Sequence, residues 1–221
     1  MHITSKPSIL YFGTPVLLIG TVNEDGSYNL APMSSAFWLG WRCMLGLATS
    51  SRTTQNILRT GECVLNLASV NEAAAVNRLA LTTGTYPVPE GKLRKGYRYE
   101  PDKFGTAGLT AIPSLTVDAP RVLECPVQLE AVVAAVHGLA DDEPAQRGLI
   151  TTIEVRIRRV HLEESILLDG MPDKVDPDKW RPLIMSFQGL YGLGPQAYPS
   201  TLKQVPERLY RTRDFEKVDT M

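Results

Sequence analysis

Val127-Gln-Leu-Glu-Ala-Val-Val133 and Ile153-Glu-Val-Arg-Ile-Arg158 carry the clearest structural signal in this chain. In both stretches apolar residues alternate with polar or charged ones, and successive side chains of a strand point to opposite faces of a sheet. One apolar face and one solvent-facing side are typical of antiparallel sheets. The polar segment 140–144 lies between the two stretches, so we expect a long hairpin in which Gln128 and Glu130 face solvent.

Shorter runs extend this sheet. Residues 16–22 are apolar and β-branched, and they end at the turn sequence Asn23-Glu-Asp-Gly26, after which a second extended run starts at Tyr28. Residues 43–49 and 63–67 are further strand candidates. Many strands with few helices and no alternation of strand and helix favour a mainly β fold, a closed or partly closed antiparallel barrel.

Two short helices are expected beside the barrel. The first covers residues 52–60, between Ser51 and Gly61, and the second covers residues 71–81, where Ser69 and Glu72 have the spacing of a capping box. Residues 82–104 are rich in Gly, Pro and basic residues without periodicity, which predicts a long functional loop.

Composition excludes several classes of protein. The 221 residues carry 23 Lys or Arg and 24 Asp or Glu, and this balance argues against a nucleic-acid binder, which needs clustered positive charge. Three separated cysteines form neither a zinc pattern nor a disulfide framework, so no metal is expected. The N-terminus lacks a signal peptide, and no apolar run is long enough to span a membrane. We expect a cytoplasmic protein with one domain over residues 1–221, ending in a charged arm at about 198–221 that could lie over a partner subunit.

The start of the first helix has an unusual composition. Helix N-termini present unpaired N–H groups and a positive dipole end, and an acidic residue commonly lies in the first turn. This helix has no acid there; it has one cation, Arg52, and five hydroxyl residues: Thr49, Ser50, Ser51, Thr53 and Thr54. Such a set suits a bound anion, most plausibly a phosphate. The alternative, which composition leaves open, is that Ser51 is an ordinary N-cap and the other hydroxyls are incidental.

A second segment, Asn29-Leu-Ala-Pro-Met-Ser-Ser-Ala-Phe37, breaks a strand. Pro32 cannot donate to a sheet ladder, so its strand needs a free edge or an interruption there. The N–H groups of Met33 and Ser34 would then be free for a ligand. The alternative is an ordinary strand end followed by a turn.

Together the two segments resemble the flavin reductase-like family of FMN-binding split-barrel proteins. That family typically shows N-x-A-P-x-S, then S-x-[KR]-T-x-x-N-I, then G-E-F-V-x-N. The matching residues are Asn29, Ala31, Pro32 and Ser34; Ser50, Arg52, Thr53, Asn56 and Ile57; and Gly61, Glu62, Val64 and Asn66. Cys63 stands where the family more often has Phe. The resemblance covers about residues 14–192.

The resemblance implies a split β-barrel homodimer that holds FMN near the subunit interface, with FAD as a possible alternative. Ser50, Arg52 and Thr53 would bind the FMN phosphate, helped by Ser51 and the neighbouring Thr49. The segment from Asn29 through Ala31, Pro32, Met33 and Ser34 to Ser35 would lie along the isoalloxazine ring. No catalytic side chain is expected, because the cofactor carries the chemistry and the protein supplies position and electrostatics.

The function expected from this resemblance is an NAD(P)H-dependent flavin reductase that transfers hydride from nicotinamide to flavin N5, with a partner monooxygenase as one recipient of the electrons. Two alternatives stay open: an FMN-containing electron carrier without nicotinamide activity, and a barrel module for another phosphorylated ligand. His161 is a weak candidate for contacting nicotinamide. The basic residues between Lys92 and Arg98 either form a solvated loop or steer a dinucleotide phosphate.

Overall fold

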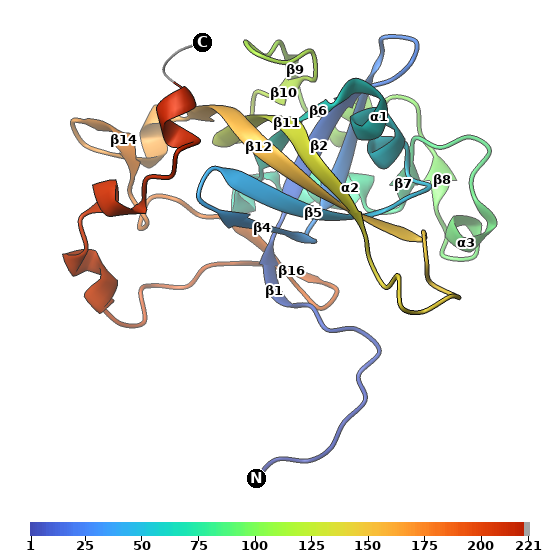
Figure 1. The fold of residues 1–221 in the computed structure, drawn as a ribbon, viewed down its shortest axis with the longest axis horizontal. Helices are drawn as coiled ribbons and strands as arrows, with labels where there is room; N and C mark the ends of the chain where they lie inside the picture. The colour runs from blue at the N-terminus through green and yellow to red at the C-terminus, as the bar shows by residue number, and fades with distance from the viewer. Residues whose placement is uncertain (219–221) are drawn as a thin grey trace.

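A seven-stranded antiparallel sheet forms the centre of the molecule (Figure 1). The structure is a computed structural model that describes residues 1–218. The strand order is β3-β2-β6-β11-β12-β5-β4. The strands are β2 (Leu17–Val22), β3 (Tyr28–Met33), β4 (Ala36–Leu39), β5 (Arg42–Ala48), β6 (Glu62–Leu67), β11 (Val127–Gly138) and β12 (Ile150–Leu162). The expected hairpins, β2–β3 and β11–β12, are both present.

Smaller sheets and short helices surround the central sheet. A three-stranded sheet joins β1 (Phe12–Pro15), β15 (Leu183–Ser186) and β16 (Gly189–Gly192). The two-stranded sheets pair β7 (Thr82–Thr83) with β8 (Arg98–Tyr99), β9 (Ala111–Ile112) with β10 (Arg121–Val122), and β13 (Leu167–Leu168) with β14 (Met171–Val175). The helices are α1 (Arg52–Thr60), α2 (Ala73–Leu79), α3 (Glu90–Leu93) and α4 (Lys103–Ala107), and the 3-10 turns are η1 (Val70–Glu72), η2 (Glu164–Ile166), η3 (Thr201–Gln204), η4 (Glu207–Tyr210) and η5 (Phe215–Lys217).

The central sheet curls around an apolar core on its inner side. Ile19 of β2, Leu45 of β5 and Ile153 of β12 all belong to one buried cluster, although three strands separate β2 from β5 in the sheet. Among the described residues the ladder ends at β3 and β4, and no pairing joins these two edges. The mainly β class with a few short helices is therefore confirmed, and the barrel is curled without a closed ladder.

A second core lies between the sheet and the helices on its other side. It contains Leu18 of β2, Leu30 of β3, Leu79 of α2 and Phe104 of α4, all buried. Helices α2 and α4 cover this side because their apolar residues face the sheet. The capping box at Ser69 and Glu72 is present, but it caps the 3-10 turn η1, so the α-helix itself begins at Ala73 and ends at Leu79.

Two sequence-based expectations differ from the structure. Gln128 and Glu130 are buried, not solvent-facing, because residues 113–122 fold over their side of the sheet. Glu130 accepts hydrogen bonds from the backbone of Leu115 and Thr116, from the Thr116 hydroxyl, and from His161. The stretch 82–104 is not a plain loop, since it contains β7, α3, β8 and the start of α4.

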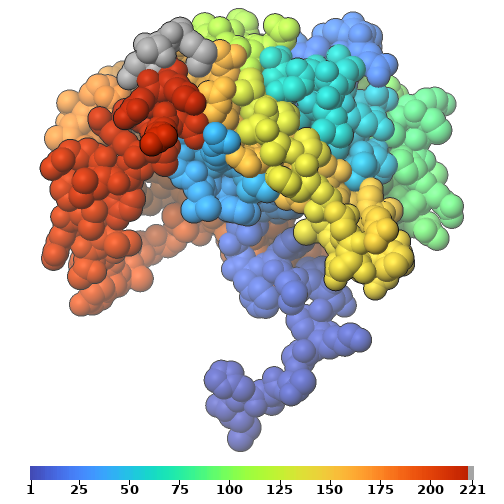
Figure 2. Space-filling view, viewed as in Figure 1, coloured from blue at the N-terminus to red at the C-terminus, as the bar shows by residue number. Residues whose placement is uncertain are grey.

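The two ends of the chain lie differently, and a contact of the C-terminal arm with a partner subunit stays a prediction. Residues 1–10 extend away from the body, whereas the C-terminal segment runs along one side of it (Figures 1 and 2). Within the arm expected at 198–221, Asp214 forms a double ion pair with Arg42, and the Phe215 ring lies 5.6 Å from that of Trp41. This part of the arm thus contacts its own chain at the β4–β5 turn, and residues 219–221 lie outside the described part.

Candidate functional site

Helix α1 begins with backbone N–H groups that have no acceptor among residues 1–218. The Ser51 side chain accepts a hydrogen bond from the Thr54 N–H at 3.1 Å and is therefore a true N-cap. No acidic residue lies in the first turn. Within residues 1–218, no recorded hydrogen bond leaves the backbone N–H of Arg52 or Thr53. The positive end of this helix is consequently open to an external anion.

The five hydroxyls at this helix start do not all face a ligand. Thr49 pairs with Thr151 at 2.8 Å, and Thr54 donates to the Ala48 carbonyl at 2.8 Å. The Thr53 hydroxyl accepts a hydrogen bond from Asn29, which leaves its own O–H hydrogen and its backbone N–H to offer an anion. Ser50 is exposed, and among the described residues no partner is recorded for its side chain. Ser50, which is exposed, and Thr53, which is buried, are therefore the residues whose hydroxyl hydrogens remain available.

A buried polar network joins the helix start to the β2–β3 hairpin. The Asn29 amide nitrogen donates to Thr21 at 3.2 Å and to Thr53 at 3.1 Å. The Asn56 amide nitrogen donates to Thr21 at 3.0 Å and to Asn23 at 2.9 Å. These hydrogen bonds hold α1 against the β2–β3 hairpin. Asn29 and Asn56 are buried, and each amide would lose hydrogen bonds if the helix moved away. The roles of Thr21 and Asn23 were not predicted, since nothing local in the sequence marks them.

Arg52 is held by a residue that the sequence analysis did not single out. Its Nε donates to the Gly84 carbonyl at 3.2 Å. A Cβ on Gly84 would lie 2.8 Å from Asn29 Oδ1 and 3.3 Å from Arg52 Cγ, so only glycine fits between these two side chains. The Gly84 carbonyl, which follows β7, thereby holds the Nε of Arg52. The two terminal nitrogens of the guanidinium stay available for an anion.

The segment from Ala31 to Ser35 lies at the edge of the central sheet. Strand β3 is the first strand in the sheet order, so Pro32 leaves no neighbouring strand without a donor. Ala31, Pro32, Met33, Ser34 and Ser35 are all partly exposed. Ser35 accepts a backbone hydrogen bond from Gly46, and no backbone acceptor is recorded for the Ser34 N–H in the described chain. The expected edge is therefore present and Ser34 is a free donor there, whereas Met33 still lies within β3 and pairs with Leu17 of β2.

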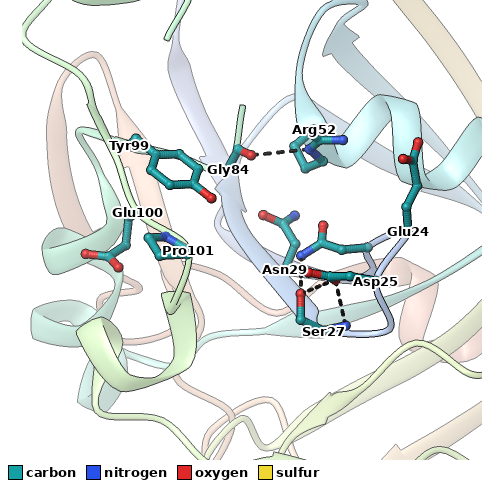
Figure 3. Close-up of a pocket in the computed structure, with 10 residues that line it drawn as sticks. Glu24, Asp25, Ser27, Asn29, Arg52, Gly84, Tyr99, Glu100 and Pro101 are labelled. Atoms are coloured by element: carbon teal, nitrogen blue, oxygen red, sulfur yellow. Dashed lines mark hydrogen bonds between the residues drawn. The ribbon is translucent and has the colours of Figure 1, made fainter. Parts of the chain in front are cut away.

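A cavity of about 250 Å³ lies beside Arg52 and Asn29. It lies between the β2–β3 turn and the segment after β8, and Tyr99 points its hydroxyl toward it (Figure 3). Its lining residues are Asn23, Glu24, Asp25, Ser27, Asn29, Arg52, Gly84, Tyr99, Glu100 and Pro101. The cavity adjoins the helix start through Arg52, but the segment 31–35 does not line it.

Other candidates lie outside this site. His161 donates its Nε2–H to Glu130 Oε1 at 2.6 Å, which makes it part of the buried network that holds residues 115–116. In the basic stretch, Lys92 donates to Thr83 at 2.9 Å and Arg98 lies 4.0 Å from Glu100. No metal-binding group of three or more His, Cys, Asp or Glu occurs in residues 1–218, and no helix there is long and apolar enough to cross a membrane.

Comparison of the chain with known proteins shows the family to which it belongs. Residues 9–190 match the family described as "Flavin reductase like domain". The chain belongs to the flavin reductase-like family. A relative from Bacillus subtilis (strain 168), the uncharacterized protein YdfE, is 37% identical over 189 residues, which is 86% of this chain and 88% of the relative. The family resemblance read from the two sequence segments is thus confirmed.

Solved structures of similar fold include flavin reductase-like proteins. Flavoredoxin of Desulfovibrio vulgaris (Miyazaki F) superposes with a TM-score of 0.72 at 22% identity, covering 91% of this chain and 98% of that one. Nitrilotriacetate monooxygenase component B from Bacillus cereus gives a TM-score of 0.68 at 20% identity, covering 87% and 89%. At this level of identity the likeness establishes the fold.

Proposed function

We propose that this flavin reductase-like protein is an FMN-binding oxidoreductase of the NAD(P)H-dependent flavin reductase type. The observation that carries the proposal is the start of α1, which combines two backbone N–H groups without acceptors in the described part of the chain, no acid in the first turn, and the cation Arg52. These groups fit a phosphate monoester such as that of FMN. Bound FMN would supply the chemistry, acceptance of a hydride from nicotinamide at flavin N5.

Each part of the chain has a separate role in this proposal. Ser50, Arg52 and the N–H of Thr53 bind the phosphate. Residues 29–35 lie along the ring, and the free Ser34 N–H stabilises negative charge at the ring's polar edge. Ser51 acts indirectly, by capping the helix whose N–H groups face the phosphate. No side chain of the protein is required as an acid, base or nucleophile.

The visible spectrum of the purified protein tests the proposal. We expect flavin absorption bands, either in the protein as purified or after FMN is added, and bleaching of these bands by NADH or NADPH. A flavin-loaded protein that neither nicotinamide reduces would instead be an electron carrier. A protein that takes up no FMN would contradict the flavin proposal.

We further propose a cytoplasmic homodimer with one domain over residues 1–221 and reduced flavin passed to an acceptor such as a partner monooxygenase. Free, buried Cys43, Cys63 and Cys125 fit a reducing compartment. Sedimentation velocity at micromolar concentration should give about twice the mass of one chain. A single species with the mass of one chain would contradict the dimer.

A further inference from the structure

A second cavity, of about 630 Å³, adjoins β8 and the end of α2. Successive side chains of a strand point to opposite sides. Tyr99 of β8 lines the cavity beside Arg52 and points toward it in Figure 3, whereas Arg98, the residue before it, lines the second cavity. Small-molecule sites usually have volumes of roughly 300–1,000 Å³, so a ligand fits here. The lining residues, none of which takes part in the proposed FMN site, are Asn77, Arg78, Ala80, Leu81, Arg98 and Thr106.

Two arginines line this cavity, and they are held differently. Arg78 donates to the Ala107 carbonyl through Nε, at 3.1 Å, and also through Nη2, which fixes the plane of its guanidinium. Its Nη1 has no recorded partner in residues 1–218. The backbone N–H of Arg98 donates to the Leu81 carbonyl at 3.0 Å, and its exposed side chain lies 4.0 Å from Glu100. One rigid and one adaptable guanidinium suit the oxygens of a phosphate group.

Positive charge gathers around this cavity. Among the described residues, none that lines it is an Asp or Glu. Lys103 is buried in α4, three residues before Thr106. Burial above all, and then repulsion by Lys92 and Arg98, hold the pKa of Lys103 down at about 8 against the opposing effect of Glu100. Cations that repel one another would be stabilised by an anion bound between them.

The other lining residues favour a nucleotide over a bare anion. Leu81 is about half exposed, and together with Ala80 it offers apolar surface that a base could cover. The Asn77 amide and the Thr106 hydroxyl have no recorded partner in the described chain, so both are available to a ribose or a phosphate. NADPH carries a phosphate monoester on the ribose next to its adenine, and NADH lacks it. Arginine is a general device for accommodating this 2′-phosphate.

We propose that this cavity binds the adenine and the 2′-phosphate of NADPH, and that Arg78 and Arg98 give the protein a preference for NADPH over NADH. The proposal rests on the proposed function, because it assumes a nicotinamide donor. It leaves Arg52 and the start of α1 to the FMN phosphate. Arg78 Nη1 and the Arg98 guanidinium donate to the 2′-phosphate, and the base covers Leu81.

Calorimetric titration of the purified protein, with FMN added, tests the preference. NADP⁺ should bind at least about tenfold more tightly than NAD⁺, the scale of one charge-assisted hydrogen bond. Arg98→Ala should remove most of this preference by weakening NADP⁺ alone, and it should fold, because the Arg98 side chain is exposed. Arg78→Lys keeps the charge without the fork and should reduce the preference about threefold. Equal affinities of NADP⁺ and NAD⁺ in the unaltered protein would overturn the proposal.

A matched control and two smaller probes sharpen the test. Arg94→Ala removes an exposed arginine of the same basic stretch that does not line the cavity, so the preference should stay unchanged. A loss as large as in Arg98→Ala would mean that the stretch attracts phosphate as a whole, and the cavity proposal would be wrong. Adenosine 2′-monophosphate should displace NADP⁺ at a lower concentration than inorganic phosphate does. Equal potency of the two would overturn the role of the base.

Further measurements separate this proposal from the flavin proposal. Arg98→Ala should raise KM for NADPH about tenfold at unchanged kcat and leave FMN affinity unaltered. If FMN fails to bind while NADP⁺ still binds in an Arg98-dependent way, the flavin proposal fails and this site stands. If bound FMN is reduced with equal KM by NADPH and NADH, this site fails and the flavin proposal stands. If Arg98→Ala weakens FMN as much as NADP⁺, the cavity belongs to FMN and the proposal is wrong.

Discussion

Arg52 is fixed on one side and available on the other. The Arg52 Nε donates a hydrogen bond to the Gly84 carbonyl, and Arg52 stands at the start of α1, where the free backbone N–H groups lie. Arg52→Ala should therefore weaken FMN binding by about 1.5–3 kcal/mol, the scale of a lost charge-assisted hydrogen bond. A fluorescence titration with FMN measures this change. Arg94→Ala is the control, since Arg94 is exposed and lies in the basic stretch away from the helix start. An unchanged dissociation constant in Arg52→Ala would remove Arg52 from the site.

Lys103 is a buried lysine whose charge affects the stability of the fold. It is only 2% exposed, and its ammonium contacts the Thr82 hydroxyl. Burial lowers the pKa of Lys103 from its usual 10.5 to about 8. Because the folded pKa lies below the unfolded one, the cost of burying the charge is complete below pH 8 and is relieved as pH rises toward 10.5.

Lys103→Met should accordingly raise the free energy of unfolding at pH 7 by about 1–3 kcal/mol, with the gain shrinking by pH 10. Urea denaturation at the two pH values measures both effects. Lys95→Met, at an exposed lysine of the basic stretch between Lys92 and Arg98, should change neither value. A gain of equal size at pH 7 and pH 10 would mean that titration of Lys103 is not its source.

Ser50 and Ser51 are neighbours at the start of α1, and we expect them to have different roles. Ser51 caps α1, and Ser50 is exposed with no partner recorded among the described residues. Ser51→Ala should lower the free energy of unfolding by about 0.5–2 kcal/mol, the usual cost of a lost N-cap. Ser50→Ala should leave stability unchanged and weaken FMN about three- to tenfold. Chemical denaturation and FMN titration on both variants test this contrast, and identical effects on the two variants would contradict it.

Elements whose signals are local could be predicted from the sequence. The bounds of α1 follow from the Ser51 cap and from Gly61, which takes the left-handed conformation at φ 75°. Pro32 correctly marked an edge strand. The burial of Glu130 could not be predicted, because the residues that cover it, 115–116, come from another part of the chain. Gly84 and Tyr99 were missed in the site for the same reason, since their contacts are set by tertiary structure.

The C-terminal arm is a feature of the whole molecule, because it connects the chain end to the turn between β4 and β5. Arg42 pairs with Asp214 through two hydrogen bonds of 2.8 and 3.2 Å, and also with Glu154 at 2.6 Å. Phe215 packs between the Trp41 ring and the Arg211 guanidinium, which lies 4.4 Å from its centroid. Arg42 and Glu154 belong to strands β5 and β12 of the central sheet, and Trp41 packs against its core, whereas Arg211, Asp214 and Phe215 belong to neither core.

Asp214→Asn should therefore release the arm without unfolding the barrel. Loss of the ionic part of the pair with Arg42 leaves a contact of few apolar groups, so the arm opens more often while the two cores stay intact. We expect limited trypsin digestion to cut after Arg208, Arg211 or Arg213 several times faster in this variant, with an unchanged melting temperature. Glu207→Gln is the control, because its 3.6 Å pair with Lys174 is exposed and contributes little. Equal cleavage rates in Asp214→Asn and the unaltered protein would show that the ion pair with Arg42 does not hold the arm, and a lower melting temperature would show that the arm is part of the barrel's cooperative unit.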